Sequence, residues 1–528
     1  MKILTTVLMS CFLLVAGCNK KEKTNYSLKI DTSVSFQTMD GFGASDAWRC
    51  QYVGKNWPLE KREQIADWLF SSETDDAGNP KGIGLSIWRF YLAAGTAEQG
   101  ESSGIKNPWR RGECFLSPDG QWDWTKYKGQ RWFLQAAKKR GVEHFLAFTI
   151  APPVQYSMNG KGFAEKGNIH FNIKTGKLPD YAAYLGQVLE HFKNEEGIQF
   201  DYISPFNEPQ WNWDEGNQEG TPALNSELVE YLGYLSKELQ QRRLKTLMVP
   251  GEAGNIEHIS SVVKNDGRDN QMEAFFSKSS PLYIGDMPNM ASLISSHSYF
   301  SVWPLDSQNN KREKLYEKMR EVNPEIGYWQ TEYCVLEKND EIGQGQKRDL
   351  GMPTAIYVAR IIHNDLTICN ARSWQWWTAL SQFDFKDGLI YLDSGTKEKP
   401  GEMGGKVETL KHDGTARDSK LLWTLGNYSR FVRPGMKRVK VVLDGERNED
   451  ETPKVLASAF LDNESGEIVI VVINTKSKEI TIDLPFSGDT KRGKMYLTSD
   501  DKNLAYSKIK QSRISLPAKA VATICYHL

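Results

Sequence analysis

The chain has 528 residues, of which 39% are hydrophobic, and a formal net charge of −1. This length exceeds one small domain and accommodates one large domain with an accessory module. The near-neutral charge and the lack of a sustained basic tract argue against a nucleic acid as partner. Sixteen tryptophans and 21 tyrosines are many for this length. Such flat aromatic side chains suit either a packed core or the faces of sugar rings.

The N-terminus has the layout of a secretory signal. Residues 1–17 contain an early lysine and an apolar stretch that is too short to span a bilayer. The ending VAGC (15–18) resembles a bacterial lipobox and predicts a lipid on Cys18; the alternative is an ordinary signal peptide with a chance cysteine. Residues 18–27 then form a polar tether, in which Asn19 favours the outer membrane. The sequence therefore predicts an outer-membrane lipoprotein of a bacterial cell envelope, periplasmic or surface-exposed, with the lipid as its only membrane contact.

Five cysteines follow the predicted signal peptide and tether, an odd number, and they show no CxxC spacing. This pattern argues against a zinc site and against a dense disulfide framework. One pair can bridge in an oxidising compartment, and Cys50–Cys114 is the predicted pair. The others are predicted to be buried free thiols. The five residues are Cys50, Cys114, Cys334, Cys369 and Cys525.

Between residues 40 and 428, short apolar runs alternate with segments of helical periodicity. Eight strands that alternate with helices predict an α/β fold, the (β/α)8 TIM barrel. Continuous apolar character is typical of parallel strands buried on both faces. The predicted strands are the runs at 39–48, 84–93, 144–153, 201–209, 245–253, 292–300, 325–333 and 371–379. The predicted helices include 59–71, 127–141, 181–197 and 226–243.

The sequence pattern changes in residues 429–528, where helical periodicity ends and short runs rich in β-branched residues follow one another closely. Their spacing, with Gly, Asn, Asp and Ser between them, predicts an antiparallel β-sandwich. Residues 28–39 are also strand-like and precede the first barrel strand. We expect this N-terminal strand to join the sandwich, which would then be a side domain built from both chain ends.

Two glutamates lie at the ends of predicted strands on opposite sides of the barrel: Glu208 at the end of the fourth and Glu332 at the end of the seventh. The C-terminal strand ends form the active face of such a barrel. Two carboxylates roughly 5 Å apart suit retaining glycoside hydrolysis, in which one acid protonates the departing oxygen while the other attacks the sugar. A lone glutamate after a strand is more often a solvated loop residue. A metal site is the other use of such acids, but no HxH or HExxH motif accompanies them, so no metal is expected.

Further polar residues fall at the predicted strand ends. Asn207 is expected to hold a sugar 2-hydroxyl. Arg89 is expected to keep Glu332 ionised and Tyr299 to donate to it. His297, taken alone, would more often be a core histidine.

Aromatic and acidic side chains complete the predicted mouth of the barrel. Asp46 and Trp48 close the first strand, and Asp46 is expected to bind a sugar hydroxyl. Trp374, Trp376 and Trp377 form a cluster, which in most proteins would only pack in the core. At a barrel mouth, we expect at least one of them to stack on a sugar ring. Trp211 is expected beside the departing sugar, with packing under its loop as the alternative.

The stretches DGFGASDAW, SPFNEPQWNW, SSHSYF, YWQTEY and SWQWW resemble glycoside hydrolase family 30, within the clan of retaining (β/α)8 hydrolases. SPFNEPQWNW with the following QEG (218–220), and WQTEYC, are most similar to the branch of endo-β-1,6-galactanases. The resemblance implies that Glu208 is the acid/base and Glu332 the nucleophile. It also implies that Arg89, Asn207, His297, Tyr299 and Trp376 line the reacting subsite. APPVQYSMNG lacks the aromatic pair of many members, and FYLAAGTAEQG lacks the aspartate of glucosylceramidase-like members, which leaves the glycan open.

The leading hypothesis is a retaining endo-β-1,6-galactanase, acting on plant-type or microbial polysaccharide by double displacement. Alternatives within the same chemistry are a β-1,6-glucanase, a xylanase or an exo-β-glycosidase. An alternative of another class is a non-catalytic surface glycan-binding lipoprotein, which would be expected to lack one of the two carboxylates. The protein is expected to act as a monomer and without a cofactor.

Overall fold

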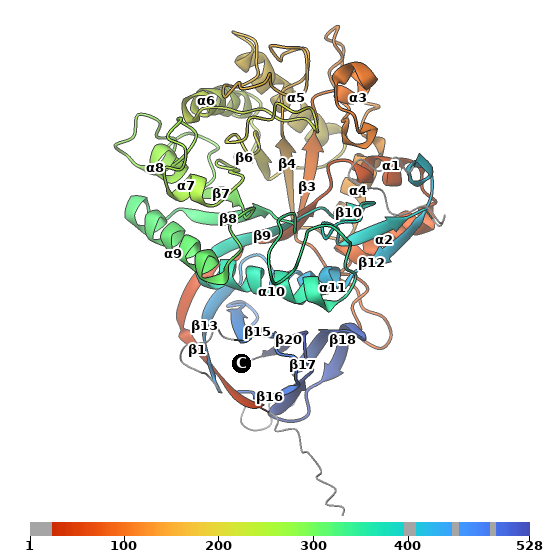
Figure 1. The fold of residues 1–528 in the computed structure, drawn as a ribbon, viewed down its shortest axis with the longest axis vertical. Coiled ribbons are helices and arrows are strands. Elements are labelled where there is room, and N and C mark those ends of the chain that lie inside the picture. Colours follow the sequence, from red (N-terminus) through yellow and green to blue (C-terminus); the bar gives the residue numbers. More distant parts are fainter. Residues whose placement is uncertain (1–23, 395–407, 446–453, 486–492, 528) are drawn as a thin grey trace, which may run out of the picture.

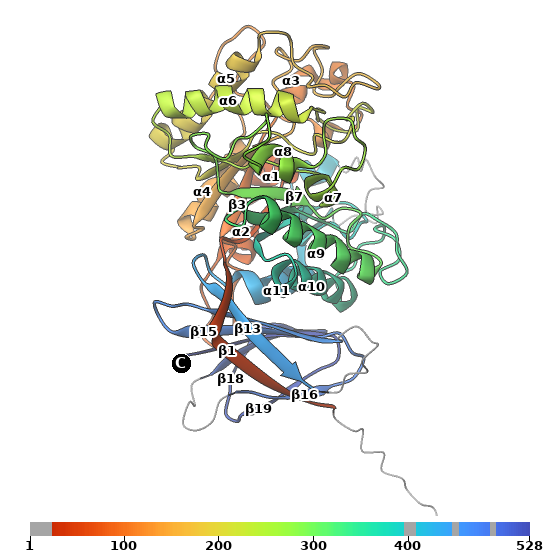
Figure 2. The same ribbon diagram turned by 90° about the vertical axis from the view of Figure 1, so that its left-hand side faces the viewer.

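The computed structural model describes residues 24–394, 408–445, 454–485 and 493–527. The chain forms a barrel of parallel strands covered by helices and, beside it, a sandwich of mostly C-terminal strands (Figure 1 and Figure 2). This topology confirms the predicted fold class. The predicted signal peptide, Cys18 and most of the tether lie outside the described residues.

Eight parallel strands form the barrel sheet in the order β6-β5-β4-β3-β2-β9-β8-β7. β6 and β7, at the ends of this order, meet through the single parallel bridges Met248–Met290 and Ala253–Ser296. Each strand lies within one of the predicted apolar runs, because side chains buried on both faces of the sheet must be apolar almost throughout. The strands are β2 (Gly41–Ser45), β3 (Ile87–Leu92), β4 (His144–Thr149), β5 (Tyr202–Ser204), β6 (Leu247–Met248), β7 (Leu293–His297), β8 (Gly327–Glu332) and β9 (Ala371–Trp377).

Amphipathic helices cover the outside of the barrel. In α5, for example, Tyr181, Leu185 and Phe192 recur at helical spacing and are buried, which places one stripe of the helix on the sheet. The described helices are α1 (Arg49–Asn56), α2 (Leu59–Phe70), α3 (Thr96–Gln99), α4 (Lys128–Lys139), α5 (Leu178–Glu195), α6 (Asn225–Gln241), α7 (Glu257–Ser260), α8 (Gln271–Phe276), α9 (Leu305–Val322), α10 (Met352–Thr367) and α11 (Lys420–Ser429). Short 3-10 turns are η1 (Gly100–Ser103), η2 (Pro108–Arg110) and η3 (Glu408–Lys411).

An insertion after β9 carries a small sheet that the periodicity of the sequence does not reveal. Its strands are β10 (Leu380–Ser381), β11 (Ile390–Asp393) and β12 (Thr415–Asp418). They are too short to give a two-residue alternation that can be recognised against a loop.

The sandwich is one sheet of nine strands in the order β18-β17-β20-β15-β14-β13-β1-β16-β19. β1 (Thr24–Thr38) pairs antiparallel with β13 and parallel with β16, so the N-terminal strand lies inside a sheet of C-terminal strands (Figure 2). Its partners are β13 (Lys437–Asp444), β14 (Val455–Leu461), β15 (Glu467–Asn474), β16 (Ile480–Asp483), β17 (Lys494–Ser499), β18 (Lys502–Lys508), β19 (Arg513–Leu516) and β20 (Ala520–His527).

Helices α10 and α11 lie between the barrel and the sandwich (Figure 1). Asn427 of α11 is fully buried and donates its side-chain amide to the carbonyl of Tyr496 at 3.1 Å and to Oγ1 of Thr523 at 3.0 Å. The apolar core runs without interruption from the barrel through these helices into β15 and β20. The sandwich is therefore packed onto the barrel rather than tethered to it.

The predicted disulfide between Cys50 and Cys114 is wrong: both residues are free and buried. Cys50 lies on α1, whereas Sγ of Cys114 lies 3.4 Å from the hydroxyl of Tyr184 on α5. Burial raises the pKa of Cys114 to about 12. Among the described residues, no helix combines the length and the apolar character needed to cross a membrane.

Candidate active site

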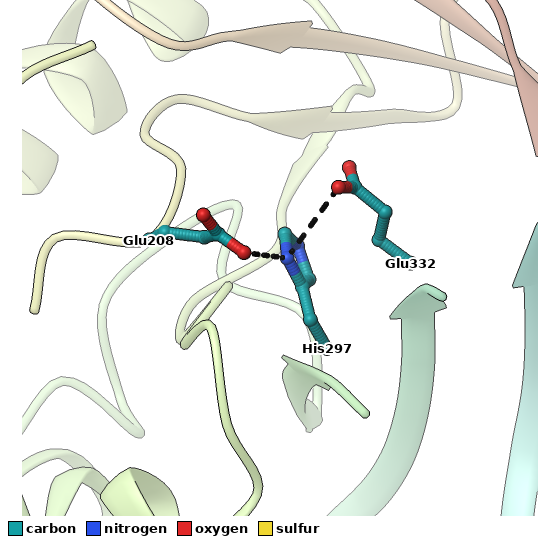
Figure 3. Close-up of side chains that lie close together, drawn as sticks. All are labelled: Glu208, His297 and Glu332. Atoms are coloured by element: carbon teal, nitrogen blue, oxygen red, sulfur yellow. Dashed lines mark hydrogen bonds and ion pairs between the residues drawn. The ribbon is translucent and has the colours of Figure 1, made fainter. Parts of the chain in front are cut away.

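Three ionisable side chains meet at the carboxyl ends of three barrel strands (Figure 3). Glu208 follows β5, His297 ends β7, and Glu332 ends β8, where it pairs with His297 across the β7–β8 ladder. Glu208 and Glu332 are only 6% and 7% exposed. The backbone of Glu208 has φ = 45°, a region that a residue with a side chain rarely adopts.

The imidazole of His297 lies between the two carboxylates (Figure 3). Its Nδ1 is 2.7 Å from Oε1 of Glu208 and 3.7 Å from Oε1 of Glu332. A carboxylate oxygen of Glu208 and one of Glu332 lie within 4.8 Å of each other. The sequence predicted that strands four and seven would bring these two acids together, and they do lie side by side.

Two donors hold the carboxylate of Glu332. Nη1 of Arg89 donates to Oε2 at 3.1 Å, and the hydroxyl of Tyr299 donates to Oε1 at 3.0 Å. Arg89 is fully buried on β3, with its guanidinium 4.4 Å from the ring centroid of Phe148. Both contacts are the ones expected from the sequence.

The pKa values of Glu208 and His297 are both raised, for different reasons. Burial raises the pKa of Glu208, the charges of Glu332 and Glu252 add to the rise, and His297 opposes it. Burial opposes a charge on His297, but Glu332, Glu208 and Glu252 outweigh it and raise the pKa of His297 to about 10. Glu208 and His297 therefore share a proton near neutral pH.

A third acid, Glu252, belongs to this cluster and was missed in the sequence. Its Oε2 lies 3.2 Å from Nε2 of His297 and 3.3 Å from Nη2 of Arg89. The run KTLMVPGEA (245–253) is one of the predicted strands, but Glu252 near its end is not among the predicted site residues. The signal for it is its position, since Glu252 follows β6 just as Glu208 follows β5.

Asn207 and Trp211 flank Glu208. Oδ1 of Asn207 is buried and has no hydrogen-bond partner within the described part of the chain, so it can still accept from a ligand. A Cβ at Gly254 would lie 2.2 Å from Nε1 of Trp211 and 3.1 Å from Oε1 of Glu208. Only glycine fits at position 254, and its lack of a side chain lets the indole of Trp211 lie close to the carboxylate of Glu208.

Comparison with known proteins identifies the family. The model of O-glycosyl hydrolase family 30 matches residues 25–391, and that of the glycosyl hydrolase family 30 beta sandwich domain matches residues 435–524. The chain belongs to glycoside hydrolase family 30. The resemblance noted in the sequence is confirmed, and this family 30 protein is a glycoside hydrolase.

Three relatives illustrate the match. An endo-beta-1,6-galactanase of Hypocrea rufa is 24% identical over 490 residues, which are 89% of this chain and 86% of the relative. A conserved exported protein of Bacteroides fragilis has a crystal structure with a TM-score of 0.86 and 35% identity, covering 94% of this chain and all of the other. The catalytic domain of a family 30 xylanase C of Talaromyces cellulolyticus has a TM-score of 0.67 and 20% identity, with 96% of this chain and 100% of that chain covered.

A groove of about 410 Å³ in this family 30 hydrolase is lined by residues 211–218, which follow Glu208 in the chain. Trp211 and Trp213 line it, and Nε1 of Trp213 donates to the carbonyl of Glu208 at 3.0 Å. Arg110 and Lys264 line it as well, and Nζ of Lys264 lies 5.1 Å from the ring centroid of Trp211. The groove is thus aromatic and polar, as a carbohydrate site requires.

Asp46 does not reach the groove, contrary to expectation. It is fully buried, and its Oδ1 accepts from the backbone N–H groups of Trp48, Arg49 and Cys50 at the start of α1. Its Oδ2 accepts from the hydroxyl of Thr378 at 3.1 Å. Both oxygens are used within the protein, so Asp46 anchors α1 to the segment after β9 and has no capacity left for a sugar hydroxyl.

The predicted tryptophans also differ in their access to a ligand. Trp374 and Trp376 are fully buried, and Nε1 of Trp376 donates to the carbonyl of Asp387 at 2.9 Å. Trp48 is 4% exposed and packs edge-on against Trp377 at 5.3 Å. Only Trp377 of this cluster is partly exposed, so it is the tryptophan that can meet a sugar in this conformation.

Glu208, His297 and Glu332 are close enough together to surround a metal ion. A metal-bound histidine must be neutral, however, and each ring nitrogen of His297 already faces a carboxylate at hydrogen-bond distance. Those carboxylates favour a protonated ring, which carries hydrogen on both nitrogens and offers no lone pair. The donor set therefore fits a proton better than a metal.

Proposed function

We propose that this family 30 hydrolase is a retaining endo-β-1,6-galactanase, with Glu332 as nucleophile and Glu208 as acid/base. One observation carries the mechanism: carboxylate oxygens of the two acids lie within 4.8 Å of each other. Inverting enzymes need a wider gap, of about 6.5–9.5 Å, to admit a water between their acids, whereas retaining ones have a gap of about 5 Å.

The two acids differ in the way this reaction needs. Glu332 accepts from Arg89 and Tyr299, which orient its carboxylate for attack on an anomeric carbon. Glu208 has a raised pKa, first because it is buried, and can keep the proton that a leaving oxygen requires. Neither acid needs a cofactor for this division of labour.

The reaction then proceeds in two displacements. Glu332 forms a bond to the anomeric carbon while the glycosidic bond breaks, and Glu208 transfers its proton to the departing oxygen. Water next attacks the same carbon, Glu208 takes a proton from it, and the bond to Glu332 breaks. The sugar leaves with its original configuration. We assign the binding of a sugar hydroxyl to Asn207, whose Oδ1 has no partner within the described residues.

The substrate class rests on relatives and on the groove. The fungal relative of 24% identity is an endo-beta-1,6-galactanase, which supports galactan. The groove lined by Trp211 and Trp213 supports binding of sugar units beyond the leaving oxygen, as endo action needs. A xylanase, a β-1,6-glucanase and an exo-β-glycosidase remain the alternatives on this scaffold. A purely glycan-binding role is disfavoured because both acids and their donors are in place.

One panel of substrates tests this proposal. We expect β-1,6-galactan to be cleaved faster than β-1,6-glucan or xylan, and to yield a ladder of oligosaccharides from the first minutes. Release of galactose alone would instead indicate exo action. Proton NMR of the first product should show the β-anomer before mutarotation; an initial α-anomer would contradict retention.

We also propose that the enzyme is a monomeric lipoprotein of the bacterial outer membrane, anchored through Cys18. The lipobox-like ending supports this, as does the relative from Bacteroides fragilis, which is described as exported. Labelled palmitate should enter the wild type and not the Cys18→Ala variant, and the variant should leave the membrane fraction. Labelling of both proteins would reject Cys18. Light scattering of residues 19–528 should give one chain per particle.

A further inference from the structure

Glu252 is a third acid of the site, fully buried behind His297. We propose that Glu252 is a positioning residue, which fixes the proton arrangement of His297 and thereby the readiness of Glu208 to act as an acid. The inference rests on the acid/base role proposed above for Glu208. It concerns a residue that would touch neither the substrate nor the reacting atoms.

Every oxygen of Glu252 is already bound within the protein. Oε2 faces Nε2 of His297 at 3.2 Å and Nη2 of Arg89 at 3.3 Å. Oε1 accepts from the hydroxyls of Ser204 at 3.0 Å and Ser295 at 2.9 Å. Because its side chain has no exposed surface, no sugar can replace these contacts. Glu252 thus contacts both His297 and Arg89, each of which contacts one of the proposed catalytic acids.

The backbone around Glu252 is as constrained as its side chain. Glu252 has φ = 46°, and its carbonyl accepts from the N–H of Glu208 at 2.8 Å. The preceding Gly251 has φ = 105°, and a Cβ there would lie 2.3 Å from the carbonyl oxygen of Ser295. A non-glycine residue in the left-handed region costs about 1 kcal/mol or more, and such strain concentrates at functional sites.

The contact with Nε2 fixes where the histidine can hold protons. A carboxylate only accepts hydrogen bonds, so the Nε2 that faces Glu252 must carry its hydrogen. A second proton can then lie on Nδ1 of His297 or on Oε1 of Glu208, 2.7 Å away. Both arrangements have the same total charge, and only the second leaves Glu208 ready to protonate a leaving group.

The charge of Glu252 makes this second proton harder to lose. His297 faces Glu208, Glu252 and Glu332, with Tyr299 beside its ring and Arg89 behind Glu252. Cys334 adds no charge, since burial raises its pKa far above the ordinary value. Burial also disfavours an ionised Glu252, but His297 and Arg89 outweigh it and lower the pKa of Glu252. Glu252 is therefore a permanent negative charge next to the shared proton.

Glu252→Gln tests the proposal because it removes the charge and keeps the shape. Loss of a negative charge lowers the proton affinity of His297 and Glu208 together. We expect the basic limb of the kcat/KM profile to move to lower pH by about one unit. The matched control is Glu219→Gln, which changes another fully buried glutamate whose hydrogen bonds go to Tyr91, Ala94 and Thr96. It can lower stability, but it should leave that limb in place.

A second readout is independent of activity. In protein labelled with ¹⁵N in its histidine rings, His297 is identified by the signal that is missing in His297→Gln. We expect its titration midpoint to fall in Glu252→Gln and to stay unchanged in Glu219→Gln. Should Glu252→Gln not fold, Glu252→Asp keeps the charge but withdraws it from Nε2, and both readouts should shift in the same direction by less.

The outcomes separate this inference from the proposed function. An unmoved basic limb and an unmoved His297 titration in a folded Glu252 variant would overturn the positioning role. Equal shifts in Glu219→Gln would do the same, because they would point to general destabilisation. Failure of the acid/base assignment itself would appear elsewhere, as full activity of Glu208→Gln on natural substrate.

Discussion

Replacing Glu332 by glutamine keeps the shape of the side chain but removes its charge. Arg89 donates to Oε2 at 3.1 Å and Tyr299 to Oε1 at 3.0 Å. In a glutamine, Arg89 can still donate to the amide oxygen, and the hydroxyl of Tyr299 can accept from the amide NH2. An amide is too weak a nucleophile to attack the anomeric carbon, so we expect Glu332→Gln to reduce kcat by roughly four orders of magnitude or more. Release of reducing ends measures the rate, and circular dichroism with thermal melting checks the fold.

The matched control for this change is Glu341→Gln. Glu341 lies in the same segment after β8, but it pairs with Arg360 at 2.5–2.7 Å, near the surface. We expect near-normal activity from this variant. A folded Glu332→Gln that cleaves at the normal rate would contradict the nucleophile assignment.

Glu208→Gln should discriminate between leaving groups. A glutamine cannot supply the proton that a sugar hydroxyl needs in order to leave, whereas a nitrophenolate leaves without one. We expect kcat/KM to fall by about 10²–10⁴-fold on galactan and far less on an aryl galactoside. Azide should then speed the second step by replacing the water that Glu208 activates. Equal losses on both substrates would count against the acid role.

At the scale of elements, the loops after β5 and β7 form an aromatic lip, defined here as Trp211 and Phe300. Their ring centroids are 6.2 Å apart and nearly perpendicular. Phe300 is 56% exposed and has φ = 57°, which is unusual for a bulky residue. An exposed aromatic side chain held this way next to Trp211 is suited to contact the departing part of the glycan.

Phe300→Ala should weaken substrate binding without disturbing the reaction. Loss of one aromatic contact is worth roughly 1 kcal/mol, so we expect KM for long galactan chains to rise about fivefold at nearly constant kcat. Leu59→Ala is the control, because Leu59 is similarly exposed, at 54%, but begins α2 on the outside of the barrel. If both variants had the same KM, the lip would have no part in binding.

Much of this element-level arrangement could be predicted from the sequence. Barrel strands are apolar runs because they are buried on both faces, and strand ends face the mouth, so Glu208, Glu332, Arg89 and His297 could be placed together. Strand order alone brings these residues into one cluster. The hydrogen bond from Tyr299 to Glu332 follows from the same argument.

Other features depend on contacts between segments that are distant in the sequence. Asp46 looks like a polar strand end, and only the segment after β9, with Thr378, shows that its oxygens are already used. Glu252 is hidden because its role needs β6, β7 and β3 to converge on one carboxylate. The error over Cys50 and Cys114 has the same origin, since the packing of α1 and α5 decides which thiols meet.

At the scale of the whole molecule, one apolar cluster joins the barrel to the inner face of the sandwich, while a separate cluster lies within the sandwich itself. Leu366 of α10 and Leu425 of α11 belong to the same buried cluster as Val471 of β15 and Val521 of β20. Neither part can expose this surface without cost, because each buried aliphatic side chain contributes about 1.5–3 kcal/mol. We therefore expect the described enzyme to unfold in a single transition rather than domain by domain.

Asn427→Ala tests whether the barrel and the sandwich unfold together, because Asn427 of α11 makes hydrogen bonds to two sandwich strands. Asn427 is fully buried, and its loss would leave the carbonyl of Tyr496 and the hydroxyl of Thr523 without their donor. We expect the free energy of unfolding to fall by about 2 kcal/mol, measured by urea denaturation. Asn25→Ala, which removes an exposed contact with Asp483 inside the sandwich, should change it by less than about 0.5 kcal/mol. If the two variants were equally stable, or if Asn427→Ala unfolded the sandwich while the barrel stayed active, the two parts would be independent.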